Sequence, residues 1–155
     1  GSPCWSVSAD QGETWTAPRP LLRRDGGAPL LHPLSPCPMY DMGGNEAGSG
    51  RYALFIHNHD GHYKQYGPTD SGFHRRPIYL VRGTFKAGAD QPVWFDEPQF
   101  FFDHDGVSLG KPGTKGRLDL ALYASWTVRD GVPVLWYPER KFFLLGKIVP
   151  KAQEK

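Results

Sequence analysis

The stretch from residue 57 to 76, "HNHDGHYKQYGPTDSGFHRR", holds the densest group of side chains that could do chemistry. Four of the six histidines of the chain lie in it, with two tyrosines and two arginines. Histidine and tyrosine can act as general acids or bases, and arginine can hold a carboxylate through two parallel hydrogen bonds. We take His57 and His59 as catalytic candidates. The substrate-binding candidates are Asn58, Asp60, His62, Tyr66, Arg75 and Arg76.

Metal binding is an alternative use of this stretch. His57 and His59 alternate at the end of a predicted strand, so both side chains face the same side. A His-x-His pair with a third histidine nearby is one arrangement that binds zinc. No residue fixes that third ligand, so we predict no metal and no cofactor, with a divalent cation as the alternative. A polar, solvated loop without a function is the other alternative.

Two further stretches carry candidate residues. Tyr137 and Glu139 lie two residues apart at a predicted strand end, where a carboxylate on the same side could take the proton of the phenol. We therefore take both as catalytic candidates. In "FFFDHDG" two aspartates flank His104 and could tune it or bind a cation, although a charged turn is the alternative. The substrate-binding candidates here are Asp103, Asp105 and Arg140.

The composition predicts an all-β chain. Nineteen glycines and 15 prolines among 155 residues, with 14% aromatic residues, are typical of short strands joined by many turns. No stretch shows a 3.6-residue apolar period. Tyr40 and Tyr123 fall inside apolar strands, where we expect their rings to pack. The predicted strands lie near residues 4–8, 14–22, 35–42, 51–58, 77–85, 92–102, 118–127, 132–137 and 141–149.

Charge and cysteine content exclude few partners. The net charge of +2 is spread along the chain, which argues against nucleic-acid binding. No apolar run approaches the roughly 20 residues of a membrane span.

We interpret Cys4 and Cys37 as two buried thiols, with a disulfide as the alternative.

The segment "SADQGETW", residues 8–15, is typical of a tight turn held by its own side chains. Gly12 provides a backbone conformation that residues with a Cβ resist. Asp10 can accept hydrogen bonds from backbone N–H groups of the turn, and Ser8 and Thr14 add hydroxyls on either side. We expect this turn to join two strands and Trp15 to leave it on the buried face.

These five residues match Ser-x-Asp-x-Gly-x-Thr-Trp completely, so the turn resembles the Asp-box, or BNR repeat, of sialidases and related β-propellers. In that family the box joins the third and fourth strands of a four-stranded blade, on the face away from the active site. The resemblance implies a partial β-propeller of about two to three antiparallel blades. It also implies a glycan as substrate and the remainder of the propeller as a partner. We expect an extracellular or periplasmic location.

An internal repeat supports that architecture. "WTAPRPLLRRDGG" (15–27) is similar to "WFDEPQFFFDHDG" (94–106), and the turn ahead of the second copy, "KAGADQPVW", would be a degenerate box. Residues 1–150 would then hold the end of one blade, a complete blade with long loops and the start of another, with 151–155 as a frayed tail. A closed propeller needs at least four blades. We therefore interpret the chain as a fragment that is inactive alone.

The resemblance also places the polar stretches. Those at 23–34, 57–76, 103–117 and 137–141 would lie opposite the box, on the face that forms the active site in sialidases. Sialidases use a tyrosine nucleophile, activated by a glutamate. No motif of this chain is specific enough to assign these roles. "RRPIYL" departs from the arginine motif of the family in residue order and position, so Arg75 and Arg76 stay candidates for anion contact only.

The sequence as a whole favours an exo-acting glycoside hydrolase of sialidase-like type. A polysaccharide lyase that uses histidine, tyrosine and arginine is the first alternative. A non-catalytic glycan-binding propeller is the second.

Overall fold

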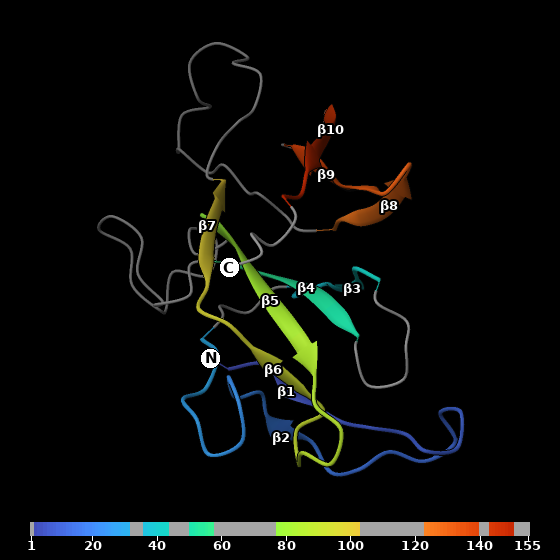
Figure 1. Cartoon of the computed structure of the whole chain (residues 1–155), viewed down its shortest axis with the longest axis vertical. Coiled ribbons are helices and arrows are strands. Elements are labelled where there is room, and N and C mark those ends of the chain that lie inside the picture. Colours follow the sequence, from blue (N-terminus) through green and yellow to red (C-terminus); the bar gives the residue numbers. More distant parts are fainter. Residues whose placement is uncertain are drawn as a thin grey trace, which may run out of the picture.

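The computed structural model of the chain describes residues 2–31, 36–43, 50–57, 77–102, 123–139 and 143–150. These residues are all-β, and their strands pair antiparallel in three sheets (Figure 1). The strands are β1 (Cys4–Trp5), β2 (Arg19–Pro20), β3 (Met39–Asp41), β4 (Arg51–His57), β5 (Ile78–Phe85), β6 (Val93–Phe95), β7 (Gln99–Phe102), β8 (Ser125–Arg129), β9 (Val132–Glu139) and β10 (Phe143–Ile148).

The central sheet is four strands wide. β3, β4 and β5 follow one another across it, and β4 pairs with β5 from Arg51 opposite Thr84 to His57 opposite Ile78. Both β6 and β7 pair with the remaining edge of β5, so together they form one interrupted fourth strand. The interruption contains Pro98, which has no N–H to donate to the ladder.

A β-bulge in β7 lets the neighbouring rings of Phe101 and Phe102 both pack against the same core. The register shifts between Ile78 and Tyr79, which pair with Phe102 and Phe100 respectively. Phe101 is therefore an extra residue in the fourth strand, as in a β-bulge. The Phe101 ring packs against the same core that contains the buried Phe102 ring.

The central sheet is buried on both faces, because successive residues of β4 point alternately into two cores. Ala53 and Phe55 belong to a core that the sheet shares with β9 of the C-terminal sheet. Leu54 and Ile56 belong to a second core, which contains Leu30 from the segment that follows β2. The central sheet thus lies between the N-terminal part of the chain and the C-terminal sheet (Figure 1).

The C-terminal sheet is a meander of β8, β9 and β10. Its first hairpin has a two-residue turn at Asp130 and Gly131, with φ angles of 51° and 72°. These are the positive values that a type I′ turn requires, and Asp-Gly is among its preferred sequences. Tyr40 of β3 ties this sheet to the central one: its hydroxyl donates to the carbonyl oxygen of Ala124 at 2.7 Å, and its ring stacks on Trp126 with centroids 5.2 Å apart.

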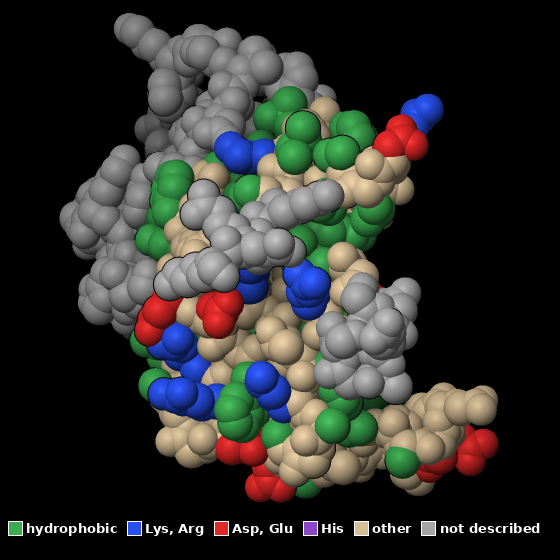
Figure 2. Space-filling model, viewed as in Figure 1, with side chains coloured by type: hydrophobic (Ala, Val, Ile, Leu, Met, Phe, Trp, Pro, Cys, Tyr) green, Lys and Arg blue, Asp and Glu red, His purple; other side chains and the backbone are tan. Residues whose placement is uncertain are grey.

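Hydrophobic side chains also lie on the surface of the C-terminal sheet, over β8–β10 in the upper part of Figure 2. Val132, Leu144 and Ile148 are exposed there. The pairing of Leu144 with Pro138, and of Ile148 with Val134, puts these residues on the face that does not pack against the central sheet.

The predicted strands agree with the observed ones in order, but several differ in extent: those predicted over 4–8 and 35–42 are observed only at Cys4–Trp5 and Met39–Asp41. The strand predicted over 92–102 is interrupted, only residues 19–20 of the segment 14–22 are paired, and the strand predicted over 118–127 is observed from Ser125 to Arg129. Tyr123 precedes that strand and its side chain is 66% exposed, so the prediction of a packed ring is wrong there and confirmed for Tyr40.

The prediction that Cys4 and Cys37 are two buried thiols is wrong in part. Both thiols are free, but Cys4 is exposed and Cys37 half-buried, because Cys4 lies on the short outer ribbon of β1 and β2. Within the described ranges no helix has the length and apolar character needed to cross a membrane.

Candidate functional site

The turn between β1 and β2 is held by its own side chains, as the sequence predicts. The hydroxyl of Ser8 donates to Oδ1 of Asp10 at 2.7 Å and accepts the backbone N–H of Gly12 at 2.7 Å. Asp10 also accepts the backbone N–H of Thr14 at 2.9 Å and its hydroxyl at 2.5 Å. Gln11 and Gly12 have φ angles of 62° and 96°, and glycine adopts the second of these at least cost. We call residues 8–15 the stapled turn.

The position of the Trp15 ring differs from the predicted one. Its side chain is 64% exposed, so the expectation of a buried ring is wrong. The indole N–H donates to the carbonyl oxygen of Gly12 at 3.1 Å, which holds the ring across the turn instead of beneath it. Trp15 therefore closes the stapled turn on its solvent side.

The carboxyl group of Asp10 is the one that the stapled turn perturbs. Hydrogen bonds from the Thr14 hydroxyl, the Thr14 backbone N–H and the Ser8 hydroxyl, in this order of size, lower the pKa of Asp10 to about 2. A folded-state pKa below the unfolded one means that the charged form stabilises the fold. This stabilisation is complete above about pH 4 and is lost as the pH falls through about 2.

Thr14→Val should raise the pKa of Asp10 more than Ser8→Ala does, because the Thr14 hydroxyl makes the largest contribution to the shift. Titration of the Asp10 carboxyl carbon by NMR would measure both shifts. Glu13→Gln is the matched control, since it changes a charge in the same turn without removing a hydrogen bond to Asp10. An unchanged Asp10 pKa in Thr14→Val would show that the hydroxyl does not bond to the carboxylate in solution.

Two of the predicted catalytic residues, His57 and Tyr137, lie toward the same end of the central sheet. His57 is the last residue of β4, and its side chain is fully buried. It pairs with Ile78, which pairs with Phe102, so the three side chains form a row on one face of the sheet. The Phe102 ring stacks on Tyr137 of β9, with centroids 4.5 Å apart. His57 and Tyr137 are thus linked through Ile78 and Phe102, although they lie 80 positions apart in the chain.

Lys147 of β10 lies against the Phe102 ring and is not among the residues that the sequence predicts. Its Nζ atom is 5.1 Å from the centroid of the Phe102 ring and 5.6 Å from that of Phe101, which is cation–π distance. Nothing local marks this lysine in "LLGKIV", because its neighbourhood arises only when β10 packs on β7. We name His57, Tyr137 and Lys147 the candidate site: Tyr137 and Lys147 contact the Phe102 ring, and His57 lies in the same row of side chains as Phe102, with Ile78 between them.

The chemistry available at the candidate site is proton transfer. Imidazole and phenol are both able to give or take a proton. The Tyr137 side chain is only 3% exposed, so its ring also has a packing role. β4 ends and β5 begins at this end of the sheet, and β7 ends there too, so the chain leaves it into the stretches 58–76 and 103–122.

Most other predicted site residues lie outside the described residues. Glu139 is described only as the last residue of β9. Those outside the described ranges are His59, Asn58, Asp60, His62, Tyr66, Arg75, Arg76, Asp103, Asp105 and Arg140. In the part of the chain that the structure covers, no group of three or more His, Cys, Asp or Glu side chains could hold a metal ion.

Comparisons with known proteins add no relatives. No protein-family model matches the chain, and no curated protein or solved structure matches it either. The fold and site define an all-β protein of stacked antiparallel sheets.

Proposed function

We propose that the chain is a sector of a sialidase-like β-propeller that cleaves a glycan at the candidate site. The main support for this proposal is the stapled turn. It has the five residues of the Asp-box at their spacing, and its hydrogen bonds run among those residues, between two antiparallel strands.

The central sheet supports the propeller architecture. It is four strands wide and antiparallel, and the turn 86–92 joins its third strand to its fourth. In the sequence Trp94 follows this turn, as Trp15 ends the stapled turn. Both turns lie toward the lower end of Figure 1, whereas β7 ends at the upper end. The repeat of turn, tryptophan and strand is what successive blades would require.

The candidate site lies at the opposite end of the central sheet from these two turns, and this location supports a reaction there. His57, Tyr137 and Lys147 come from two neighbouring sheets, and active sites on propellers use loops and strand ends of several blades. A tyrosine nucleophile fits the exo-acting hydrolase, with Glu139 two residues further along β9 as its base.

A polysaccharide lyase is the second candidate function. It is favoured by the placement of His57 and Tyr137 toward the same end of the central sheet, because elimination next to a uronate needs one group to take a proton and another to give one. In this case Lys147 would help to neutralise the carboxylate of the substrate.

Mass spectrometry of the products from a panel of glycans, incubated with the full-length protein, tests both functions. Products that together weigh one water more than the substrate indicate hydrolysis. Products of unchanged total mass, with a new double bond, indicate elimination. A panel in which every glycan is bound but none is cleaved would contradict both and leave a glycan-binding propeller.

A further inference from the structure

A pocket of about 250 Å³ lies at the other end of the central sheet from the candidate site. Its walls come from the ribbon of β1 and β2, from the segment after β2 and from the turn before β6. In the lower part of Figure 2, over these elements, basic and acidic side chains lie side by side. The lining residues are Trp5, Arg19, Pro20, Leu22, Asp25, Gly26, Asp90 and Gln91.

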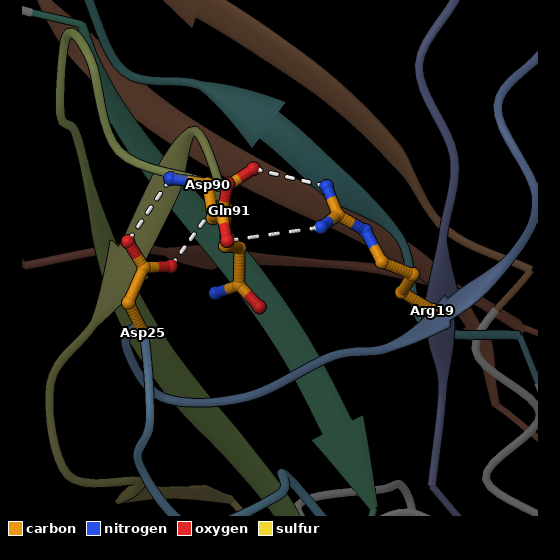
Figure 3. A network of polar contacts seen from close by, with 4 residues as sticks. All are labelled: Arg19, Asp25, Asp90 and Gln91. Atoms are coloured by element: carbon orange, nitrogen blue, oxygen red, sulfur yellow. Dashed lines mark hydrogen bonds and ion pairs between the residues drawn. The ribbon is translucent and has the colours of Figure 1, made fainter.

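The floor of the pocket is rigid. Asp25 accepts the backbone N–H groups of Asp90 and Gln91 at 3.0 and 2.9 Å (Figure 3). The buried Gln91 side chain accepts the N–H of Leu22 at 2.8 Å and donates to the carbonyl oxygens of Leu22 and Val93, both at 2.7 Å. These bonds use every polar atom of the Gln91 amide and fix the segment after β2 to the turn before β6. The pocket is therefore formed before any ligand arrives.

Arg19 and Asp90 are the polar groups that retain bonding capacity. The Arg19 guanidinium lies over the Trp5 ring, 4.2 Å from its centroid, and donates to the Asp90 carbonyl oxygen at 3.2 Å. Its Nη1 atom is 4.0 Å from Oδ2 of Asp90, which is too long for a good hydrogen bond. The Asp90 side chain is 87% exposed, so this ion pair holds its carboxylate weakly.

Charge decides which class of ligand suits these groups. One arginine faces two aspartates in the pocket, Asp25 and Asp90, so an anion would be repelled by both carboxylates and a cation by Arg19. A hydroxyl group both donates and accepts a hydrogen bond. Neighbouring hydroxyls of a neutral ligand can therefore accept from Arg19 and donate to Asp90 at the same time.

The volume and the apolar walls of the pocket restrict the class of ligand further. A volume of 250 Å³ is that of roughly eight water molecules, which leaves room for one six-membered ring. Trp5, Pro20 and Leu22 offer apolar surface to the C–H groups of such a ring. We propose that this pocket, which we call the Arg19 pocket, binds one neutral sugar ring of a glycan, with two adjacent hydroxyls bonded to Arg19 and Asp90. The choice of a glycan rests on the proposed function, whereas the pocket itself does not.

NMR titration of the full-length protein would test the proposal. The probes are the methyl glycosides of galactose, mannose and glucose, with cyclohexanol as a six-membered ring that has a single hydroxyl. At least one glycoside should shift the indole signal of Trp5 with a millimolar dissociation constant. It should bind at least about ten times more tightly than cyclohexanol, because each bond to a charged group contributes on the order of a tenfold change in affinity.

Two variants and a matched control identify the residues that bind. Arg19→Gln should weaken the glycoside about tenfold or more, and Asp90→Asn should weaken it several-fold. Arg129→Gln should leave it unchanged, because Arg129 also lies 4.0 Å from an aspartate but is almost fully exposed and outside the pocket. If Arg19→Gln does not fold, Arg19→Lys serves instead, since it keeps the charge without the planar fork. Its binding should also be weaker.

The outcomes separate this proposal from the proposed function. The Arg19 pocket is excluded if no glycoside shifts the Trp5 signal, if cyclohexanol binds as well as the glycosides, or if Arg19→Gln binds like the unmodified protein. His57→Gln should leave binding in the pocket unchanged. Binding without turnover on any glycan would overturn only the catalytic proposal, and turnover without binding would overturn only the Arg19 pocket.

Discussion

Phe102→Ala is expected to lower the free energy of unfolding by about 3–5 kcal/mol. The Phe102 side chain is 1% exposed and belongs to the core between the central and C-terminal sheets. It touches rings on both sides: Tyr137 stacks on it, and Phe101 packs edge-on with centroids 5.2 Å apart. Its removal leaves a cavity in the interface that joins the two sheets.

Thermal unfolding followed by circular dichroism would measure this loss as a fall in melting temperature of roughly 6–20 °C for a chain of this size. Phe100→Ala is the matched control, since Phe100 lies on the same strand but is 63% exposed. It should cost about 1 kcal/mol or less, mainly through its edge contact with Tyr79. Equal losses in the two variants would mean that the sheets do not pack through Phe102.

Tyr137→Phe is expected to lower kcat on the cleaved glycan by at least about a thousandfold, if Tyr137 is the nucleophile. The variant removes only the phenolic oxygen, so the ring that stacks on Phe102 is retained. The fold should therefore survive, and the loss would be chemical. Steady-state kinetics together with thermal unfolding of the same sample would separate the two effects.

Tyr40→Phe makes the same chemical change away from the candidate site. It removes the hydrogen bond from the Tyr40 hydroxyl to the Ala124 carbonyl oxygen, at 2.7 Å, and should cost about 1 kcal/mol of stability with kcat unchanged. Full activity in Tyr137→Phe would assign Tyr137 to the core alone. A loss in His57→Gln, with full activity in Tyr137→Phe, would make His57 the acting group and favour elimination.

Local patterns explain which parts of the fold are predictable from the sequence. The largely continuous apolar segments 51–57 and 78–85 each face two apolar cores, and both are strands as predicted. The stapled turn is predictable because all of its hydrogen bonds join residues at most four apart. The break at Pro98 is less visible, since the apolar residues continue on both sides of it.

The predictions fail where the position of a side chain depends on an unusual hydrogen bond or on a contact with a residue far away in the sequence. Trp15 has the character of a core residue, but a single hydrogen bond from its indole to Gly12 keeps the ring outside. Tyr123 lies in an apolar segment whose strand begins only at Ser125. Lys147 and Tyr137 come together at Phe102 through packing between sheets, which no spacing along the chain reveals.

The unequal connections between paired strands have a consequence for the order of folding. β8 and β9 are joined by two residues with the dihedral angles of a tight hairpin, whereas residues 58–77 separate β4 from β5. Closing the longer connection costs more chain entropy before any pairing compensates for it. We expect the β8–β9 hairpin to form on the microsecond scale and the central sheet to zip together later. The C-terminal sheet would then offer a ready surface on which Phe55, Ile78 and Phe102 collapse.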